Sequence, residues 1–339
     1  MNKNSLLLIG LLCLGVVFTA CESTTTPPVV ITKFTDSTLF ALSEGDFGKN
    51  NAELDGYSLK TDTLSKNIIN PLGDVGNDIQ IFGKRLYVVV ENSDKILAIN
   101  PDSVADRISI EFGAGSTPYN MAEASSSEVW VSEFHAREIG IMNTVTNTLT
   151  SKVPIDTTLA YLSIYNGKAF LLTNTNKLEV IDIATKNVLA NKYIGEYPAE
   201  IVIDSAHNSV VVLTYGDAFG AKTLSKIFWV DANTFAYTDS ISISASDFLN
   251  QLIPAGSKAY LTFGDRVDIL DLGTHKISPF IQTPYYKGIF DPTANELVVG
   301  RGSFSAPGNV DILDAATGVV KKTFSAGILP GHFVIYRKQ

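Results

Sequence analysis

Polar side chains that could bind or activate a ligand recur along the chain, each preceding the first apolar position of a short strand-like segment. They carry the carboxyl, amide, ammonium and imidazole groups that acid/base catalysis or polar recognition requires. If the segments converge on one axis, these side chains form a ring that could hold a ligand or a hydrated ion. In the alternative interpretation they only line a water-filled channel. They are Asp78, Asn120, Tyr161, Glu200, Lys287 and His332, with a further member near Asp247.

Three long segments between strand-like runs combine glycines with one aromatic residue. They are "GDFGK" around Phe47, "DAFGA" around Phe219 and "GSFSAPG" around Phe304. Glycine permits tight backbone paths, and an exposed phenylalanine would offer a flat apolar contact to a ligand. A phenylalanine that folds back would only cover its own loop. Polar side chains close by would orient a polar edge of the ligand, namely Asp46, Asn51, Asp217 and Arg301.

Other kinds of site chemistry find little support in the residue pattern. The four histidines fall in different repeats without paired metal-ligand spacing, and neither a serine elbow nor a glycine loop before a helix is recognisable. We therefore expect no metal, no cofactor and no dedicated catalytic residue. The alternative is a hydrolase with acid/base groups at Glu200, His332 and Asp78, in which replacing Glu200 by Gln would abolish turnover.

The elements that must position these residues follow from a repeat. One pattern occurs seven times at intervals of 39 to 49 residues: two strand residues, then Asp, Asn or Ser, two further residues, and Thr or Ser. An Asp or Asn side chain accepts hydrogen bonds from backbone amides two or three residues ahead and so closes a tight turn. We interpret these positions as structural corners between two strands. They are Ser58, Asn100, Asn143, Asp182, Asp231, Asp271 and Asp314.

Four short strands surround each corner. In the second repeat they are "NDIQIF", "RLYVVVE", "KILAINP" and "DRISIEF". Four strands per forty-odd residues, with no room for a long amphipathic helix, is the period of a propeller blade. The first repeat has only three strands, and "HFVIYRK" at the chain end supplies a fourth. We therefore predict an all-β, seven-bladed propeller over residues 37–339, closed by the C-terminal strand joining the first blade.

The repeat resembles the YVTN (YncE-like) type of propeller repeat. Residues 176–204, "NKLEVIDIATKNVLANKYIGEYPAEIVID", are its closest copy, and a proline precedes four innermost strands, at Pro118, Pro198, Pro284 and Pro330. The opening "ALSEGDFGKNNAELDGYSLKTDTL" is similar to the start of cell-surface propeller lipoproteins, some of which capture cobalamin or related corrinoids for an outer-membrane transporter. The resemblance implies the fold and a role in capture, but no residue here matches a corrinoid contact specifically.

The N-terminal residues indicate export and lipid anchoring. Lys3 precedes an apolar run from Leu6 to Phe18, which is too short to span a membrane but typical of a signal peptide. Ala20 directly precedes Cys21, which resembles the lipobox of bacterial lipoproteins. The alternatives are an ordinary secretory cleavage or a cysteine that is merely buried.

These features predict three parts of the chain. Residues 1–20 form the leader, and residues 21–36 form a tether that begins at the lipidated Cys21 and is rich in Thr and Pro. The propeller occupies the rest. Since Cys13 leaves with the leader, the mature domain has no thiol from which to form a disulfide.

Composition and pattern narrow the function to three hypotheses. A net charge of −9 argues against nucleic acid and anionic lipid headgroups as partners. The first hypothesis is a monomeric, lipid-anchored domain that captures a small molecule or an envelope protein at the outer membrane, on its periplasmic or its outer surface. The second is the propeller hydrolase, similar to lactonases. The third is an envelope scaffold whose long loops contact other proteins, which the sequence does not separate from the first.

Overall fold

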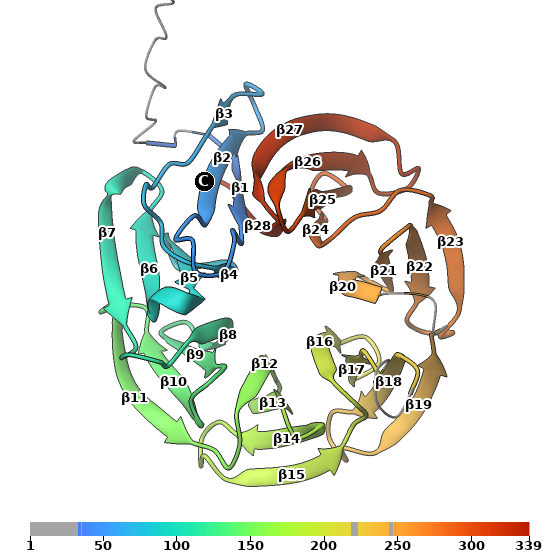
Figure 1. Ribbon diagram of the computed structural model, residues 1–339. Coiled ribbons are helices and arrows are strands. Elements are labelled where there is room, and N and C mark those ends of the chain that lie inside the picture. The colour runs from blue at the N-terminus through green and yellow to red at the C-terminus, as the bar shows by residue number, and fades with distance from the viewer. Residues whose placement is uncertain (1–32, 35, 218–222, 244–246, 248, 339) are drawn as a thin grey trace, which may run out of the picture. The chain divides into compact units, whose positions relative to one another are not determined.

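Seven four-stranded antiparallel sheets succeed one another around a ring in the computed structural model, which confirms the predicted architecture (Figure 1). The structure describes residues 33–34, 36–217, 223–243, 247 and 249–338. The predicted leader, the predicted lipidation site Cys21, most of the predicted tether and the candidate ligand-binding Phe219 lie outside these residues. A single 3₁₀ turn, η1 (Glu91–Ser93), is the one helical element among the described residues. No helix in that part of the chain has the length and apolar character needed to cross a membrane.

Each sheet is one blade, and its strands are ordered from the ring axis outward. Blade 1 consists of β28 (Pro330–Tyr336), β1 (Thr38–Ser43), β2 (Glu53–Ser58) and β3 (Leu64–Ser65); blade 2 of β4 (Gly76–Phe82), β5 (Arg85–Val90), β6 (Lys95–Asn100) and β7 (Ser103–Glu111). Blade 3 consists of β8 (Pro118–Ser125), β9 (Glu128–Glu133), β10 (Glu138–Asn143) and β11 (Thr148–Pro154); blade 4 of β12 (Leu159–Tyr165), β13 (Lys168–Thr173), β14 (Lys177–Asp182) and β15 (Val188–Tyr193). Blade 5 consists of β16 (Pro198–Asp204), β17 (Ser209–Thr214), β18 (Lys226–Asp231) and β19 (Tyr237–Ser242); blade 6 of β20 (Leu249–Ala255), β21 (Lys258–Phe263), β22 (Val267–Asp271) and β23 (Ile277–Ile281); and blade 7 of β24 (Gly288–Asp291), β25 (Glu296–Ser303), β26 (Ala306–Asp314) and β27 (Val320–Ile328).

Burial within a blade follows from its position between two neighbours. A middle strand is covered on both faces, so β17 reads "SVVVLT" and all six of its residues are buried. Strands covered on both faces need apolar residues on both sides, which gives continuous runs of Val, Leu and Ile. The outermost strand β19 reads "YTDSIS" and is mostly exposed. This gradient explains why the inner and middle strands are apolar while the rim is polar.

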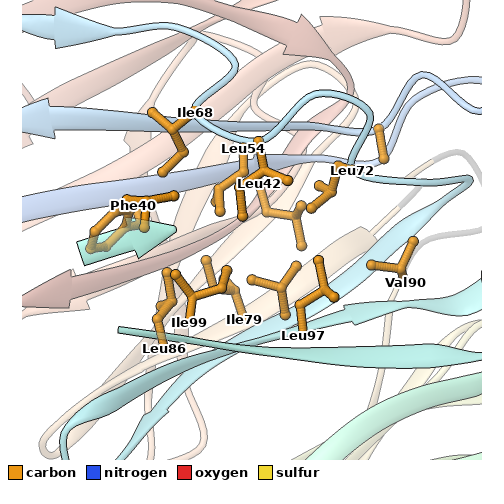
Figure 2. Packing of buried hydrophobic residues seen from close by; sticks show 14 of the residues in the cluster. Phe40, Leu42, Leu54, Ile68, Leu72, Ile79, Leu86, Val90, Leu97 and Ile99 are labelled. Atoms are coloured by element: carbon orange, nitrogen blue, oxygen red, sulfur yellow. The ribbon is translucent and has the colours of Figure 1, made fainter. Parts of the chain in front are cut away.

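The hydrophobic core is divided into seven clusters, one between each pair of adjacent blades. Figure 2 shows the cluster between blades 1 and 2, where Phe40, Leu42 and Leu54 face Leu86 and Ile99. A single blade could not bury these faces by itself. The propeller therefore depends on every blade having a neighbour on both sides.

The repeated corners have the predicted structural role. Asp182 Oδ1 accepts hydrogen bonds from the Thr185 amide at 2.8 Å and its hydroxyl at 2.7 Å, and Asp231, Asp271 and Asp314 make the same pair of contacts. The residue after each Thr adopts a positive φ, 61° at Lys186 for example, which turns the chain into the outermost strand. These aspartates therefore stabilise the turns between the third and fourth strands.

Ring closure occurs as the sequence predicts. β28 pairs antiparallel with β1, with Phe333 opposite Ala41 and Ile335 opposite Leu39, and so supplies the innermost strand of blade 1 (Figure 1). Phe333 is buried between blades 7 and 1, where its cluster includes Leu39 and Val298. The ring is thus closed by hydrogen bonds and by apolar packing between the two ends of the described chain.

One expectation about the loops is wrong. The segment around Phe304, expected to be a loop, is a hairpin in which β25 and β26 continue beyond the blade, with Ser303 paired to Ala306. Its glycines permit close packing, since a Cβ on Gly300 would lie 1.8 Å from the Pro330 carbonyl oxygen. The sequence "GRGSFSAPG" therefore serves as two strands that pass tightly over the start of β28.

Replacing Phe333 by Ala should lower the free energy of unfolding by about 3–5 kcal/mol, because a buried aromatic side chain would leave a cavity at the ring closure. Phe304→Ala is the matched control, since Phe304 is 76% exposed and its loss should cost less than about 0.5 kcal/mol. Urea unfolding of both variants provides the measurement. Equal stability of the two variants would contradict the closure described here.

Candidate functional site

A polar cavity lies on the ring axis near the starts of the innermost strands. We call this the upper face; the connections between second and third strands lie there too. The cavity has a volume of about 160 Å³, and every blade contributes at least one residue to its wall. It brings together all six side chains that the sequence placed on the axis. The lining residues are Asn77, Asp78, Asn120, Tyr161, Leu162, Ser163, Ala199, Glu200, Ile201, Asn250, Gln251, Lys287 and His332.

Two lining residues, Asn250 and Gln251, belong to the sixth blade, whose member of the ring the sequence placed only near Asp247. The sixth blade contributes Asn250 and Gln251 and not Asp247, whose carboxylate is paired with Arg266 at 2.8 Å. Gln251 directly precedes the buried Leu252, just as Glu200 directly precedes Ile201. This polar-then-apolar step at the start of β20 is the signal that would have found it.

Four of the lining side chains also join neighbouring blades. Each accepts a hydrogen bond from a backbone N–H in the innermost strand of the next blade, and we call these contacts the inter-blade clips. The donors and acceptors are Met121 N to Asp78 Oδ2 at 2.8 Å, Leu162 N to Asn120 Oδ1 at 2.9 Å, Leu252 N to Glu200 Oε2 at 2.6 Å, and Gly288 N to Gln251 Oε1 at 2.7 Å. These side chains are held in fixed positions before any ligand arrives.

A largely buried ion pair spans the ring closure beside the cavity. Glu44, which directly follows β1, accepts hydrogen bonds from Lys287 Nζ and Tyr286 Oη, each at 2.9 Å, and lies 3.2 Å from His332 Nε2. It thus ties blade 7 to both inner strands of blade 1. The sequence analysis missed Glu44 because an acidic residue at a strand end carries no distinctive local pattern.

The buried charges of this group determine its protonation. Burial raises the pKa of Glu44, but Lys287 and the His332 hydrogen bond outweigh it and hold that pKa well below its usual range. Burial disfavours the charged form of Lys287, yet Glu44 keeps its pKa well above the usual value. Burial and the positive charge of Lys287 lower the pKa of His332. At neutral pH the group is therefore one Lys–Glu ion pair beside a neutral imidazole.

The other carboxyls at the axis have no equivalent counter-charge. Burial raises the pKa of Glu200 to about 8, against the opposing effects of the Leu252 amide and Lys287. Burial likewise raises the pKa of Asp78, although the amides of Met121 and Ile79 favour its ionised form. Glu200 is therefore mostly protonated at neutral pH, which makes it a hydrogen-bond donor and a candidate general acid.

The long segments that carry Phe47 and Phe304 on the upper face match the sequence-based expectation only partly. Phe47 and Phe304 are each 76% exposed, so neither folds back over its own segment. The Phe47 loop is held by hydrogen bonds from the Asp46 amide to Asn51 Oδ1 at 2.7 Å and from the Gly48 amide to Asp74 Oδ2 at 2.8 Å. Asn51 thus shapes its own loop.

The two polar residues of the other long connections also have partners within the chain. Arg301 is paired with the buried Asp311 at 2.8 Å, which anchors the β25–β26 hairpin to its blade. The Asp217 amide donates to Thr223 Oγ1 at 2.7 Å across the connection that contains Phe219. Both contacts stabilise the connections that carry the aromatic residues.

A second, larger cavity of about 1460 Å³ opens at the opposite, lower face. It lies along the innermost strands β4, β24 and β28, and it shares Asp78, Gln251 and His332 with the upper cavity. Its wall includes Ile81 and Val334, and the sequence analysis did not anticipate it. The Phe34 amide donates to the Pro101 carbonyl at 3.0 Å in the β6–β7 turn, so the described chain begins at this lower face.

Comparisons with known proteins identify the fold. No family model matches the chain, and no curated protein matches it. The hydrazine synthase of Kuenenia stuttgartiensis shares 12% identity at a TM-score of 0.63, with 78% of this chain and 95% of that chain covered. The periplasmic gluconolactonase of Pseudomonas aeruginosa shares 12% at 0.64, with 88% and 99% covered. The apo form of AztD from Citrobacter koseri shares 11% at 0.55, with 89% and 98% covered. At these identities the likeness establishes the propeller alone.

Chemically, the upper cavity offers a rigid ring of donors and acceptors with one internal ion pair. No group of three or more His, Cys, Asp or Glu side chains suited to a metal ion occurs among the residues described. The arrangement can bind a small polar molecule and could protonate one through Glu200.

The Glu200→Gln variant should depend less on pH than the parent chain. The folded pKa of Glu200, about 8, lies above its ordinary value of 4.5, so the stability from its proton is full below pH 4.5. That stability is lost as the pH rises through 8, by up to about 1.4 kcal/mol for each pH unit. Relative to the parent, Glu200→Gln should become steadily more stable between pH 5 and 8.

Thermal and urea unfolding at pH 5, 6.5 and 8 would measure this difference. Glu123→Gln, at an exposed carboxyl in the wall of the larger cavity at the lower face, is the control and should follow the parent at all three values. A constant difference between Glu200→Gln and the parent would show that Glu200 is ionised in the folded chain.

Proposed function

We propose that this chain is a lipid-anchored protein of the bacterial envelope that captures a small molecule at the upper face of its propeller. The observation that carries the proposal is the upper cavity, to which all seven blades contribute and in which polar side chains are fixed by inter-blade clips. Small-molecule sites are commonly preformed hollows with a few precisely placed polar groups. Such a site pays little ordering cost on binding, because its side chains are already in place.

The proposed anchor precedes the described residues in the sequence. The described residues begin at the lower face, where the Phe34 amide contacts Pro101. Two acyl chains or more on Cys21 would hold the domain durably at a membrane.

Phe47 and Phe304 favour a second partner on the same face. Rigid, exposed aromatic side chains are typical anchors of protein–protein contacts. We propose that they contact an envelope protein, with an outer-membrane transporter that receives the captured molecule as the partner of choice. A corrinoid is larger than the upper cavity and would have to rest against these tips, which makes a smaller nutrient the better fit.

A hydrolase is the second candidate, favoured by one observation. Glu200 is a buried carboxyl on the axis with its pKa raised to about 8, which suits a general acid. His332, neutral at the same pH, lines the same cavity. Glu200→Gln would remove the transferable proton and abolish turnover, whereas ligand capture would persist in that variant.

Capture itself is tested by an equilibrium binding screen of the chain without its anchor. Purified Cys21→Ser protein lacking the leader is titrated calorimetrically with sugars, organic acids, amino acids and corrinoids. We expect saturable binding of one class with one site per chain. Absence of saturable binding across the screen would overturn capture.

Anchoring is tested by replacing each cysteine separately. Cys21→Ser should abolish incorporation of radiolabelled palmitate and move the protein from the membrane fraction to the soluble fraction, because the chain without its leader would have no thiol for lipid attachment. Cys13→Ser, within the expected leader, is the matched control and should stay labelled and membrane-bound. Labelling that survives Cys21→Ser would contradict the proposed anchor.

A further inference from the structure

We propose that the upper cavity binds a neutral, polyhydroxylated small molecule of about the size of one sugar ring. This inference rests on the proposed capture function and specifies its ligand. It follows from three properties of the cavity: its size and polarity, its internal charge balance, and the hydrogen-bonding groups that the fold leaves available.

Size and polarity restrict the ligand first. A cavity of about 160 Å³ has room for one six-membered ring, since an engineered cavity of about 150 Å³ binds benzene. The wall has four carboxamides, two carboxyls, one lysine, one histidine, one tyrosine and one serine, but only three aliphatic residues. A compact ligand in such a space must make a hydrogen bond from nearly every edge, which an apolar or singly substituted molecule cannot do.

Charge balance restricts it further. Lys287 is already neutralised by Glu44 at 2.9 Å. Asp78 accepts backbone N–H bonds from Met121 and Ile79, each at 2.8 Å, and Glu200 is held protonated by burial. Among the described residues, an anionic ligand would find no unpaired cation at the axis, and a cationic ligand would find only Asp78, whose carboxyl already accepts backbone N–H bonds and whose pKa is raised by burial, so burying either charge is costly. A neutral ligand avoids that cost.

The available hydrogen-bonding groups are both donors and acceptors. The Asn250 amide nitrogen donates to the Tyr285 carbonyl at 3.0 Å, and among the described residues nothing donates to its Oδ1, which can accept from a ligand. His332 uses Nε2 toward Glu44, and no described group engages Nδ1. Lys287 donates one N–H to Glu44 and has further N–H groups, and the protonated Glu200 adds an O–H donor. Hydroxyl groups match this mixture because each one both donates and accepts.

An aromatic surface borders the polar ring. Tyr161 lines the cavity and packs edge-to-face on Tyr119 with ring centroids 5.3 Å apart, and Tyr119 in turn stacks on Phe134 at 5.3 Å. The face of a sugar ring that carries C–H groups is apolar and packs favourably on an aromatic side chain. Hydroxyl edges toward the ring of polar groups and a C–H face toward Tyr161 would satisfy both surfaces.

The test compares sugars that share one carbon skeleton but are neutral, anionic or cationic. Calorimetric titration compares neutral hexoses, pentoses and their alditols with the matching uronates and amino sugars at pH 7. We expect at least one neutral probe to bind one site per chain, at least tenfold more tightly than its charged counterparts. Asn250→Ala should weaken that binding about tenfold by removing the free acceptor, whereas Glu123→Gln in the wall of the larger cavity at the lower face should leave it unchanged.

Every outcome of this comparison bears on the inference. Should Asn250→Ala fail to fold, Ser163→Ala, also in the cavity wall, replaces it and should weaken binding several-fold. If a uronate or amino sugar binds more tightly than its neutral counterpart, and Asn250→Ala weakens that binding, the neutral ligand class is overturned. Capture at the upper cavity would then still hold. If no sugar probe binds but another nutrient in the binding screen does, the neutral sugar-like ligand is likewise overturned and capture still holds. Failure of every compound would overturn both proposals.

Discussion

Closure of the ring is the constraint on which the rest of this structure depends. Each blade buries its faces only against its neighbours, so an open ring would expose two apolar faces, one on blade 1 and one on blade 7. Closure is secured twice, by the antiparallel pairing of β28 with β1 and by Glu44, which contacts Tyr286, Lys287 and His332. The same contacts place Lys287 and His332 at the axis. The groups that close the ring therefore also form one side of the candidate site.

Structure and binding share residues throughout the upper cavity. The clips from Asp78, Asn120, Glu200 and Gln251 hold neighbouring innermost strands together. Because a buried carboxyl or amide needs partners, each clip satisfies a side-chain oxygen that would otherwise be costly to bury in the cavity wall. Glu200 illustrates the balance: its clip favours the ionised form, burial favours the protonated form, and burial prevails. The polar wall of the upper cavity is thus an ordered surface and not only the lining of a water-filled channel.

The sequence predicted the features that repeat and failed where a feature is unique. The Asp182-type corners and the pairing of the C-terminal strand could be derived because short local patterns recur or lack a partner. Glu44 was missed because its role depends on Lys287, more than two hundred residues away. Gln251 was missed because the start of β20 lacks the proline that marks β8, β16 and β28. The exposure of Phe304 could not be derived, since it depends on how β25 and β26 extend over Pro330.

Hydrogen exchange of the leaderless Cys21→Ser chain, with and without the ligand that the screen selects, tests the central claim most directly. A molecule seated among the clips should slow exchange at the amides of Leu162 and Leu252, which donate to Asn120 and Glu200 beside the cavity. The amide of Lys186, in a distant corner between β14 and β15, should exchange at the same rate in both samples. Slower exchange confined to the larger cavity at the lower face, or no change at the clip amides in the presence of saturating ligand, would contradict capture at the upper face.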